Sequence, residues 1–218
     1  MKKYFSLSVF LAASFFSGSS QAATLSFEGS AYGFRTVQFQ TTPVTPAFNP
    51  AGAGAFKMSD GVDEFLAYCL DITRRLLNSS EYEQTKAPWS FNSLAGSLGR
   101  LQNVFDANYG ANIDTADESA AFQMALWNTI YDSDWDLTAG TFRASSSAAV
   151  NSGAAVYLAN AETYAGPKRY NLSFFEAVGT PQSQSLVTAS AVPLPAAGLL
   201  LLSALGLGAV VSRRRNRA

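Results

Sequence analysis

Two apolar segments, one at each end of the chain, limit which residues can fold as a water-soluble domain. Residues 1–22 have the pattern of a secretory signal: Lys2 and Lys3 give a positive start, an apolar run follows, and small residues lead up to Ala22. The apolar run is too short to span a bilayer. We therefore expect an exported protein that is cleaved after Ala22, with Ala23 as the alternative cleavage position.

The last 27 residues, 192–218, differ in composition from everything before them. Residues 196–211 are almost uninterruptedly apolar and contain no charge, and the arginines Arg213, Arg214, Arg215 and Arg217 close the chain. The run is a little shorter than the roughly 20 residues of a comfortable spanning helix. A buried core helix is the alternative, but terminal arginines suit a cytoplasmic stop better than a core. The pattern predicts a transmembrane helix.

The apolar run is preceded by the residues Val192, Pro193, Leu194, Pro195 and Ala196. Together with the helix and the arginines, they resemble the PEP-CTERM sorting signals of bacteria, in the Val-Pro-Leu-Pro-Ala variant. The resemblance implies that an exosortase-type enzyme recognises the tail in the inner membrane of a Gram-negative bacterium. It further implies processing near the proline motif and a final place on the cell surface or in an exopolysaccharide or biofilm matrix.

Composition excludes several classes of function for the part between the ends. We expect one extracytoplasmic domain at 23–178 and a spacer at 179–191. Without Lys2, Lys3 and the tail arginines, nine basic residues stand against 16 acidic ones, which argues against nucleic acid as a partner. The chain has no histidine and one cysteine, so histidine-dependent proteases and most zinc sites are disfavoured. We expect no cofactor, no metal and no turnover enzyme.

Hydrophobic periodicity predicts strands, then helices, then strands. The expected strands are 24–40, 55–58, 62–73, 168–178 and 183–188, with a proline-rich loop at 41–54 and a polar turn region at 78–88. The expected helices are 93–109, 119–131 and 146–164, the second preceded by the capping-box residues Thr115 and Glu118. This order predicts an α+β fold: a barrel-like or sandwich-like β framework with an inserted subdomain of two to three helices, plus the C-terminal transmembrane helix.

Two residues in the predicted domain are out of place. Cys69 is the lone cysteine of an exported chain and lies on a strand-like stretch, 65–72. By itself such a residue is usually a small buried hydrophobe. Gln123 shares a helix face with Trp127 and Ile130, at spacings of four and seven. An unpaired buried amide costs about 1–3 kcal/mol, so this glutamine needs a partner.

Tyr-Cys-Leu-Asp on a strand, followed by Gln-x-Ala-Leu-Trp on a helix, resembles the thioester domains of bacterial surface adhesins over residues 62–132. In that family the Cys and Gln side chains condense with loss of ammonia, and the acyl group then reacts with a nucleophile of a partner. The resemblance implies that Cys69 is the thiol and Gln123 the acyl donor. It also implies that Tyr68 and Trp127 wall the site and that Asp71 orients nearby backbone groups.

The acidic residues leave two other interpretations open. Asp132, Asp134 and Asp136 alternate as calcium ligands do, although the glycine and closing glutamate of an EF-hand loop are absent. A hydrolase without histidine would depend on a carboxylate pair, either Asp117 with Glu118 or Asp132 with Asp134. Both pairs are better explained as the start and the stop of a helix.

Three hypotheses follow. The first is a surface or matrix attachment domain that forms a thioester and reacts once with an amine-bearing protein or exopolysaccharide. The second is a structural or exopolysaccharide-associated matrix protein of the same export class, in which Cys69 is core and the Gln123 amide is paired with backbone. The third is the carboxylate-based hydrolase. A Cys69→Ala variant separates them, because covalent capture is abolished only under the first.

Overall fold

The computed structural model describes residues 22–193, except 88, 93 and 111–112. The predicted signal sequence up to residue 21, the residues Leu194, Pro195 and Ala196 of the predicted sorting motif, the apolar run and the terminal arginines lie outside the described residues. Within the described part, no helix has the length and apolar character needed to cross a bilayer.

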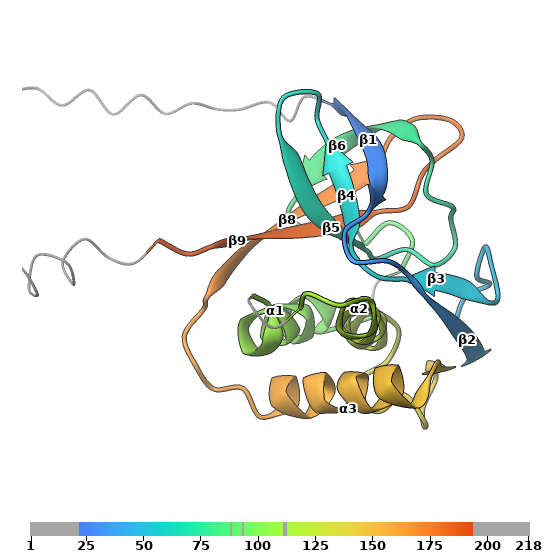
Figure 1. Cartoon of the computed structure of the whole chain (residues 1–218), viewed down its shortest axis with the longest axis vertical. Coiled ribbons are helices and arrows are strands. Elements are labelled where there is room, and N and C mark those ends of the chain that lie inside the picture. Colours follow the sequence, from blue (N-terminus) through green and yellow to red (C-terminus); the bar gives the residue numbers. More distant parts are fainter. Residues whose placement is uncertain (1–21, 88, 93, 111–112, 194–218) are drawn as a thin grey trace, which may run out of the picture.

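Six antiparallel strands form a closed barrel, seen in the upper half of Figure 1. Their order around the barrel is β1 (Ala23–Ser30), β4 (Phe56–Ser59), β5 (Glu64–Cys69), β9 (Leu186–Ala191), β8 (Tyr170–Ala177) and β6 (Ser79–Thr85). Side chains alternate between the two faces of a strand, so Leu25, Met58 and Tyr82 are buried while polar neighbours such as Glu81 are exposed. Closure pairs every barrel strand on both sides, which leaves no open edge.

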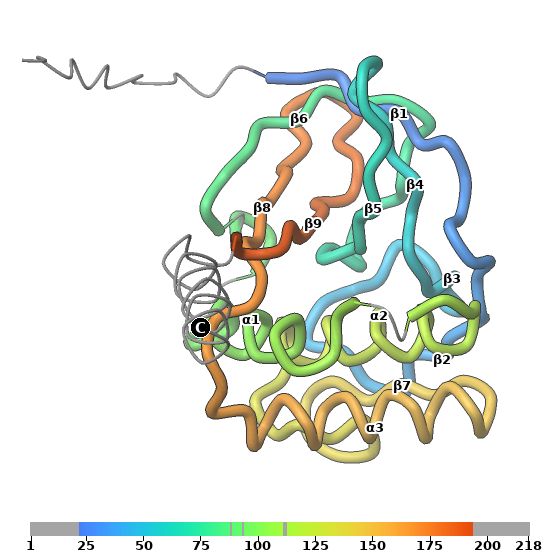
Figure 2. Tube along the Cα trace, turned by 60° about the vertical axis from the view of Figure 1, so that its left-hand side comes forward, coloured from blue at the N-terminus to red at the C-terminus, as the bar shows by residue number. Residues whose placement is uncertain are grey.

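A second, smaller sheet and three helices lie below the barrel in Figure 1. The sheet has the order β3 (Ala51–Ala53), β2 (Arg35–Thr41) and β7 (Arg143–Ser145). The helices are α1 (Ser97–Asn108), α2 (Ala116–Tyr131) and α3 (Ala148–Glu162). In Figures 1 and 2, α1 and α2 lie side by side between the barrel and α3.

Helix α2 is the central element of the helical layer. It packs against α1, α3, β2 and β3, and every residue from Ser119 to Tyr131 is buried. Because α2 is buried on all sides, no contrast between a polar and an apolar face orients it. Local contacts at its N-terminus therefore fix where it begins. The predicted capping box is present: Thr115 Oγ1 accepts a hydrogen bond from the Glu118 N–H at 3.2 Å, and Glu118 Oε2 accepts one from the Thr115 N–H at 3.1 Å.

The β framework with inserted helices agrees with the α+β prediction, and the barrel is the form it takes. Two segments were predicted wrongly: the turn region at 78–88 contains β6, and the loop at 41–54 contains β3. The strand expected at 183–188 is present as β9, but it continues to Ala191 and so occupies the end of the expected spacer at 179–191. β7 was not predicted at all. The domain therefore extends at least to Ala191.

The errors have one physical cause. β6 has one buried large apolar side chain, Tyr82, and β9 has two, Leu186 and Val187. The β6 pattern is too weak to indicate a strand by itself, and the β9 pattern indicates only the part of the strand up to residue 188. In the barrel, both segments are held by hydrogen bonds to neighbours on either side, β1 and β8 for β6, and β5 and β8 for β9. Strand formation depends on this pairing more than on local propensity.

Candidate functional site

Cys69 is the last residue of β5, and Gln123 is in the middle of α2. The structure brings the two together. The Cys69 N–H donates a hydrogen bond to Gln123 Oε1 at 2.9 Å, and Gln123 Nε2 donates one to the Cys69 carbonyl oxygen at 2.7 Å. Each of these residues is 1 % exposed. The core-facing glutamine therefore has its partner, and that partner is the backbone of the lone cysteine.

The register of the barrel explains why this backbone is free to bind a side chain. In a strand, the N–H and C=O of one residue point to the same edge, and alternate residues share an edge. The pairing between β4 and β5 ends at Ala67, opposite Phe56, while the Leu70 N–H donates to Ser185 on the β9 side at 2.8 Å. Cys69 thus faces the side that β4 has left. The Gln123 carboxamide takes the place of the next peptide group of β4.

The Cys69 thiol lies in a surround that keeps it protonated. Burial raises the pKa of Cys69 strongly, and the negative charge of Asp71 raises it further. The indole N–H of Trp127 acts in the opposite direction and lowers the pKa. Sγ donates its proton to the Asp71 carbonyl oxygen at 3.3 Å. A thiol of this kind does not react with solutes as an exposed thiolate would.

Trp127 lies one helical turn after Gln123 on the same face of α2. Its indole N–H is buried and close enough to the thiol to lower the thiol pKa, and it has no hydrogen-bond partner in the part of the chain that the structure describes. The indole ring packs edge-on against Phe39 of β2, with ring centroids 5.4 Å apart. Trp127 therefore covers the sulfur and brings an unused hydrogen-bond donor to it.

Tyr68 packs on the opposite face of β5 from the Cys69 thiol. Successive strand residues point to opposite faces, so the Tyr68 ring leaves β5 away from the Cys69 side chain. The ring packs against Phe122 of α2 at 5.0 Å and against Phe105 of α1 at 6.4 Å between centroids. Tyr68 thereby holds the strand to the helices and closes the helix side of the pair.

Asp71 organises the loop that follows β5. Its carboxylate is fully buried and accepts hydrogen bonds from the Thr73 N–H at 2.8 Å and the Thr73 hydroxyl at 2.6 Å. It also forms an ion pair with Arg74, with Nη1 and Oδ2 3.0 Å apart. These bonds engage the carboxylate with the loop, while only the Asp71 carbonyl oxygen contacts the thiol.

One residue of the site, Tyr131, was not identified from the sequence. Its hydroxyl accepts a hydrogen bond from the Ile72 N–H at 3.1 Å and donates one to the Leu70 carbonyl oxygen at 3.2 Å. It therefore fixes the chain just beyond Cys69, as Gln123 fixes Cys69 itself. The signal was available: Tyr131 lies eight residues after Gln123, on the same face of the helix.

The acidic residues 132–136 serve the loop after α2. Asp132 accepts hydrogen bonds from the backbone N–H groups of Ser133 and Phe142, and Asp136 accepts one from Thr138, each at 2.7 Å. Burial raises the pKa of Asp132, but these donors together lower it below its ordinary value. Among the residues that the structure describes, no group of three or more histidine, cysteine, aspartate or glutamate side chains could hold a metal ion.

The other carboxylate pair has a structural use as well. Asp117 forms an ion pair with Arg35, and the capping bonds with Thr115 lower the pKa of Glu118. Both side chains lie at the start of α2, on the surface.

The chain leaves the barrel through a backbone hydrogen bond: the Val192 N–H donates to the Arg169 carbonyl oxygen at 2.8 Å, immediately after β9. The described part of the predicted sorting motif, Val192 and Pro193, thus begins where the barrel ends.

Comparison with known proteins gives little further information. No protein-family model matches the chain, and no curated protein matches it. Among solved structures, the chain is similar to the N-terminal domain of the Streptococcus pyogenes pilus tip adhesin Cpa. The identity is 18 %, the TM-score is 0.46, and the match covers 76 % of this chain and 97 % of the other. A likeness this distant carries no inference about function.

Proposed function

We propose that this protein is a surface or matrix attachment protein in which Cys69 and Gln123 condense to an internal thioester. The thioester then reacts once with a nucleophile on a partner. The observation that carries the proposal is the pair of hydrogen bonds between the Gln123 carboxamide and the Cys69 backbone. They fix the acyl carbon beside the residue that bears the thiol, and so supply the proximity that an acyl transfer needs.

The same hydrogen bonds support the first chemical step. Cys69 Sγ attacks the Gln123 carboxamide carbon, and negative charge develops on Oε1, to which the Cys69 N–H already donates at 2.9 Å. A backbone N–H in this position acts as an oxyanion donor. The carbon–nitrogen bond then breaks, the thiol proton passes to the departing nitrogen, and ammonia leaves.

The surround supports the storage and the use of the acyl group. Burial of both residues keeps out the water that would hydrolyse a thioester. In the second step an amine of the partner attacks the acyl carbon and forms an amide. The carbon–sulfur bond breaks, and the amine proton goes to the sulfur. The Trp127 N–H is placed to stabilise the thiolate as it leaves.

A probe amine tests capture directly. The purified protein is incubated with a biotin-linked primary amine and examined on a denaturing gel, beside the Cys69→Ala and Gln123→Ala variants. Covalent labelling of the wild-type protein alone is the expected result. Labelling of either variant, or absence of labelling in the wild-type protein, contradicts the proposal.

One observation favours the second candidate, a non-covalent structural or exopolysaccharide-associated matrix protein. The Gln123 amide is fully paired with backbone, so the pair can also act as a simple extension of the β4–β5 ladder. In that case the thiol remains free, and Cys69→Ala changes only stability.

Export and sorting form the second part of the proposal. We infer from the sequence of residues 192–218 that an exosortase-type enzyme in the inner membrane of a Gram-negative bacterium delivers the protein to the cell surface or matrix. Deletion of residues 192–218 is expected to release the protein into the periplasm or the medium. Cell fractionation measures this, and unchanged surface display of the truncated protein contradicts it.

A further inference from the structure

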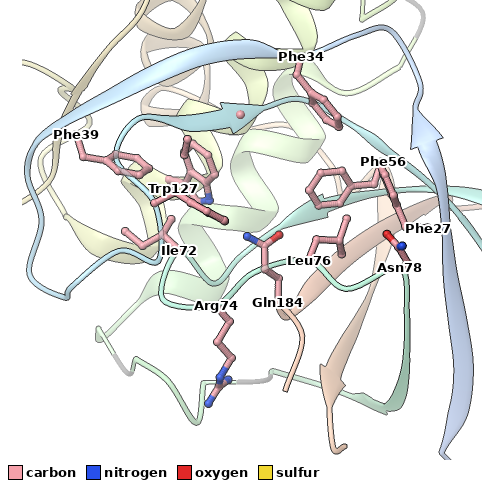
Figure 3. A pocket seen from close by; sticks show the side chains of 13 residues that line it. Phe27, Phe34, Phe39, Phe56, Ile72, Arg74, Leu76, Asn78, Trp127 and Gln184 are labelled. Carbon is pink, nitrogen blue, oxygen red and sulfur yellow. The ribbon is translucent and has the colours of Figure 1, made fainter. Parts of the chain in front are cut away.

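A cavity of about 250 Å³ reaches Trp127, one helical turn after Gln123 on α2. It lies between the barrel and the small sheet, and its lining includes six aromatic residues: Phe27, Phe34, Phe39, Phe48, Phe56 and Trp127. Figure 3 shows Phe39 and Trp127 at one end and Phe27 and Phe56 at the other. Gln184 extends between these two groups.

Trp127 connects this cavity to the reactive pair. Its ring lines the cavity, while its N–H lies close to the Cys69 sulfur. Ile72, three residues after Cys69, lines the same end of the cavity. Trp127 is therefore the residue that lines the cavity and also lies on the Gln123 face of α2.

The polar groups of the cavity define what it can bind. Gln184 Oε1 is buried and has no hydrogen-bond partner among the described residues, so it lacks a donor. The charge of Arg74 is offset by Asp71, and its guanidinium points away from the aromatic rings in Figure 3. No carboxylate lines the cavity. This lining suits an uncharged ligand that has an apolar face and hydrogen-bond donors on its edge.

We propose that the cavity is the acceptor site for an amino sugar, whose ring lies on the aromatic side chains. This inference rests on the proposed function, because it names the group that the thioester acylates. A pyranose ring presents C–H groups on its faces and hydroxyl donors on its edge, which matches the aromatic walls and Gln184. Its amine reaches the acyl carbon past Trp127. The apolar walls of the cavity favour the uncharged, nucleophilic form of the amine, because burial disfavours the charged form.

Binding is tested first, in a protein that cannot form the thioester. D-Glucosamine is titrated into the Cys69→Ala variant, with Trp fluorescence and ligand-observed NMR as readouts. A Gly52→Leu substitution adds a side chain at a position that lines the cavity, where an added Cβ meets only Phe34, at 3.8 Å. Gly99→Leu on the exposed face of α1 is the matched control, where an added Cβ meets nothing within 4 Å. We expect binding with Cys69→Ala alone and with Gly99→Leu added, and loss of binding with Gly52→Leu added.

Capture is tested second, in proteins with Cys69 intact. Gly52→Leu should slow covalent capture of glucosamine about tenfold or more and change capture of methylamine less than about twofold, since methylamine needs no ring site. Equal effects on both amines, or no glucosamine binding to Cys69→Ala, overturn the acceptor site. Faster capture of a lysine peptide than of glucosamine also overturns it. Absence of any capture, with glucosamine binding retained, instead refutes the thioester and leaves the cavity as a sugar site.

Discussion

At the scale of single residues, the site depends on an asymmetry between its two members. Gln123 contributes its side chain, whereas Cys69 contributes its backbone to both hydrogen bonds and its thiol only to the Asp71 carbonyl oxygen. Loss of the thiol therefore leaves the pairing between β5 and α2 intact. Loss of the carboxamide leaves a buried N–H and a buried C=O without partners, which is the more costly change.

This asymmetry predicts unequal effects on stability. Relative to wild-type protein in which the thioester is absent, Cys69→Ala should lower the free energy of unfolding by about 1 kcal/mol, the cost of a small cavity. Addition of Gln123→Ala to Cys69→Ala should lower it by at least about 2 kcal/mol more. Neither protein can form a thioester, so urea denaturation compares the pairing alone. If adding Gln123→Ala lowers the free energy of unfolding by no more than Cys69→Ala does, the two hydrogen bonds contribute little.

The Trp127 indole predicts a change in rate. Trp127→Phe keeps a ring over the sulfur but removes the N–H that lowers the thiol pKa. Loss of a donor that stabilises the leaving thiolate should slow methylamine capture about tenfold or more. Trp89→Phe, which alters a ring packed against Phe91 and Phe174, is the control. Equal rates in both variants would remove Trp127 from the mechanism.

At the scale of elements, α2 is held at both ends by carboxylates. Glu118 completes the capping box at the start, and Asp132 accepts the N–H groups of the following loop at the end. Gly140 belongs to this second arrangement. It has φ +68, and an added Cβ would lie 2.2 Å from a carboxylate oxygen of Asp132 and of Asp134.

Gly140→Ala should therefore lower the free energy of unfolding by about 2 kcal/mol or more, because it combines backbone strain with a clash against two anchoring carboxylates. Gly99→Ala is the matched control: Gly99 is exposed within α1, where alanine is better than glycine by about 0.5–1 kcal/mol. Thermal unfolding of both variants measures the contrast. A neutral Gly140→Ala would mean that the loop relaxes without loss.

At the scale of the whole molecule, the sequence predicted the contact between Cys69 and Gln123 better than it predicted the barrel. Cys69 and Gln123 each violate a local rule, so each carries its own signal. The α2 capping box is likewise local. The strands β6 and β9 contain few buried large apolar residues and form because barrel closure supplies distant partners: Tyr82 of β6 pairs with Ala177 of β8, and Val187 of β9 pairs with Tyr68 of β5. Long-range pairing of this kind leaves no periodicity in a single segment.

Closure also buries tyrosine hydroxyl groups, which predicts a response to alkaline pH. Burial raises the pKa of Tyr82 to about 12 and raises those of Tyr68 and Tyr131 further. In the unfolded chain they ionise near pH 10. Above that pH the unfolded state binds fewer protons, so the folded state loses stability by about 1.4 kcal/mol per pH unit for each tyrosine that remains protonated.

We expect the free energy of unfolding to keep its full value below pH 10 and to decrease steeply from pH 10 to pH 12. Urea denaturation at pH 8, 10 and 11 measures the slope, and Tyr82→Phe should reduce it by the share of one tyrosine. A free energy of unfolding that is constant from pH 8 to 11 would contradict the burial of these hydroxyl groups.

The mass of the intact protein is the most direct measure of whether a thioester bond joins Cys69 and Gln123. The protein is purified without reductant or amine buffers and measured before and after treatment with methylamine, with Cys69→Ala as the control. We expect the wild-type protein to have a mass one ammonia below the calculated value, and methylamine to raise it by the mass of one methylamine. The control should have its calculated mass before and after treatment. A wild-type protein at its full calculated mass, with Cys69 open to alkylation after unfolding, would contradict the proposed thioester.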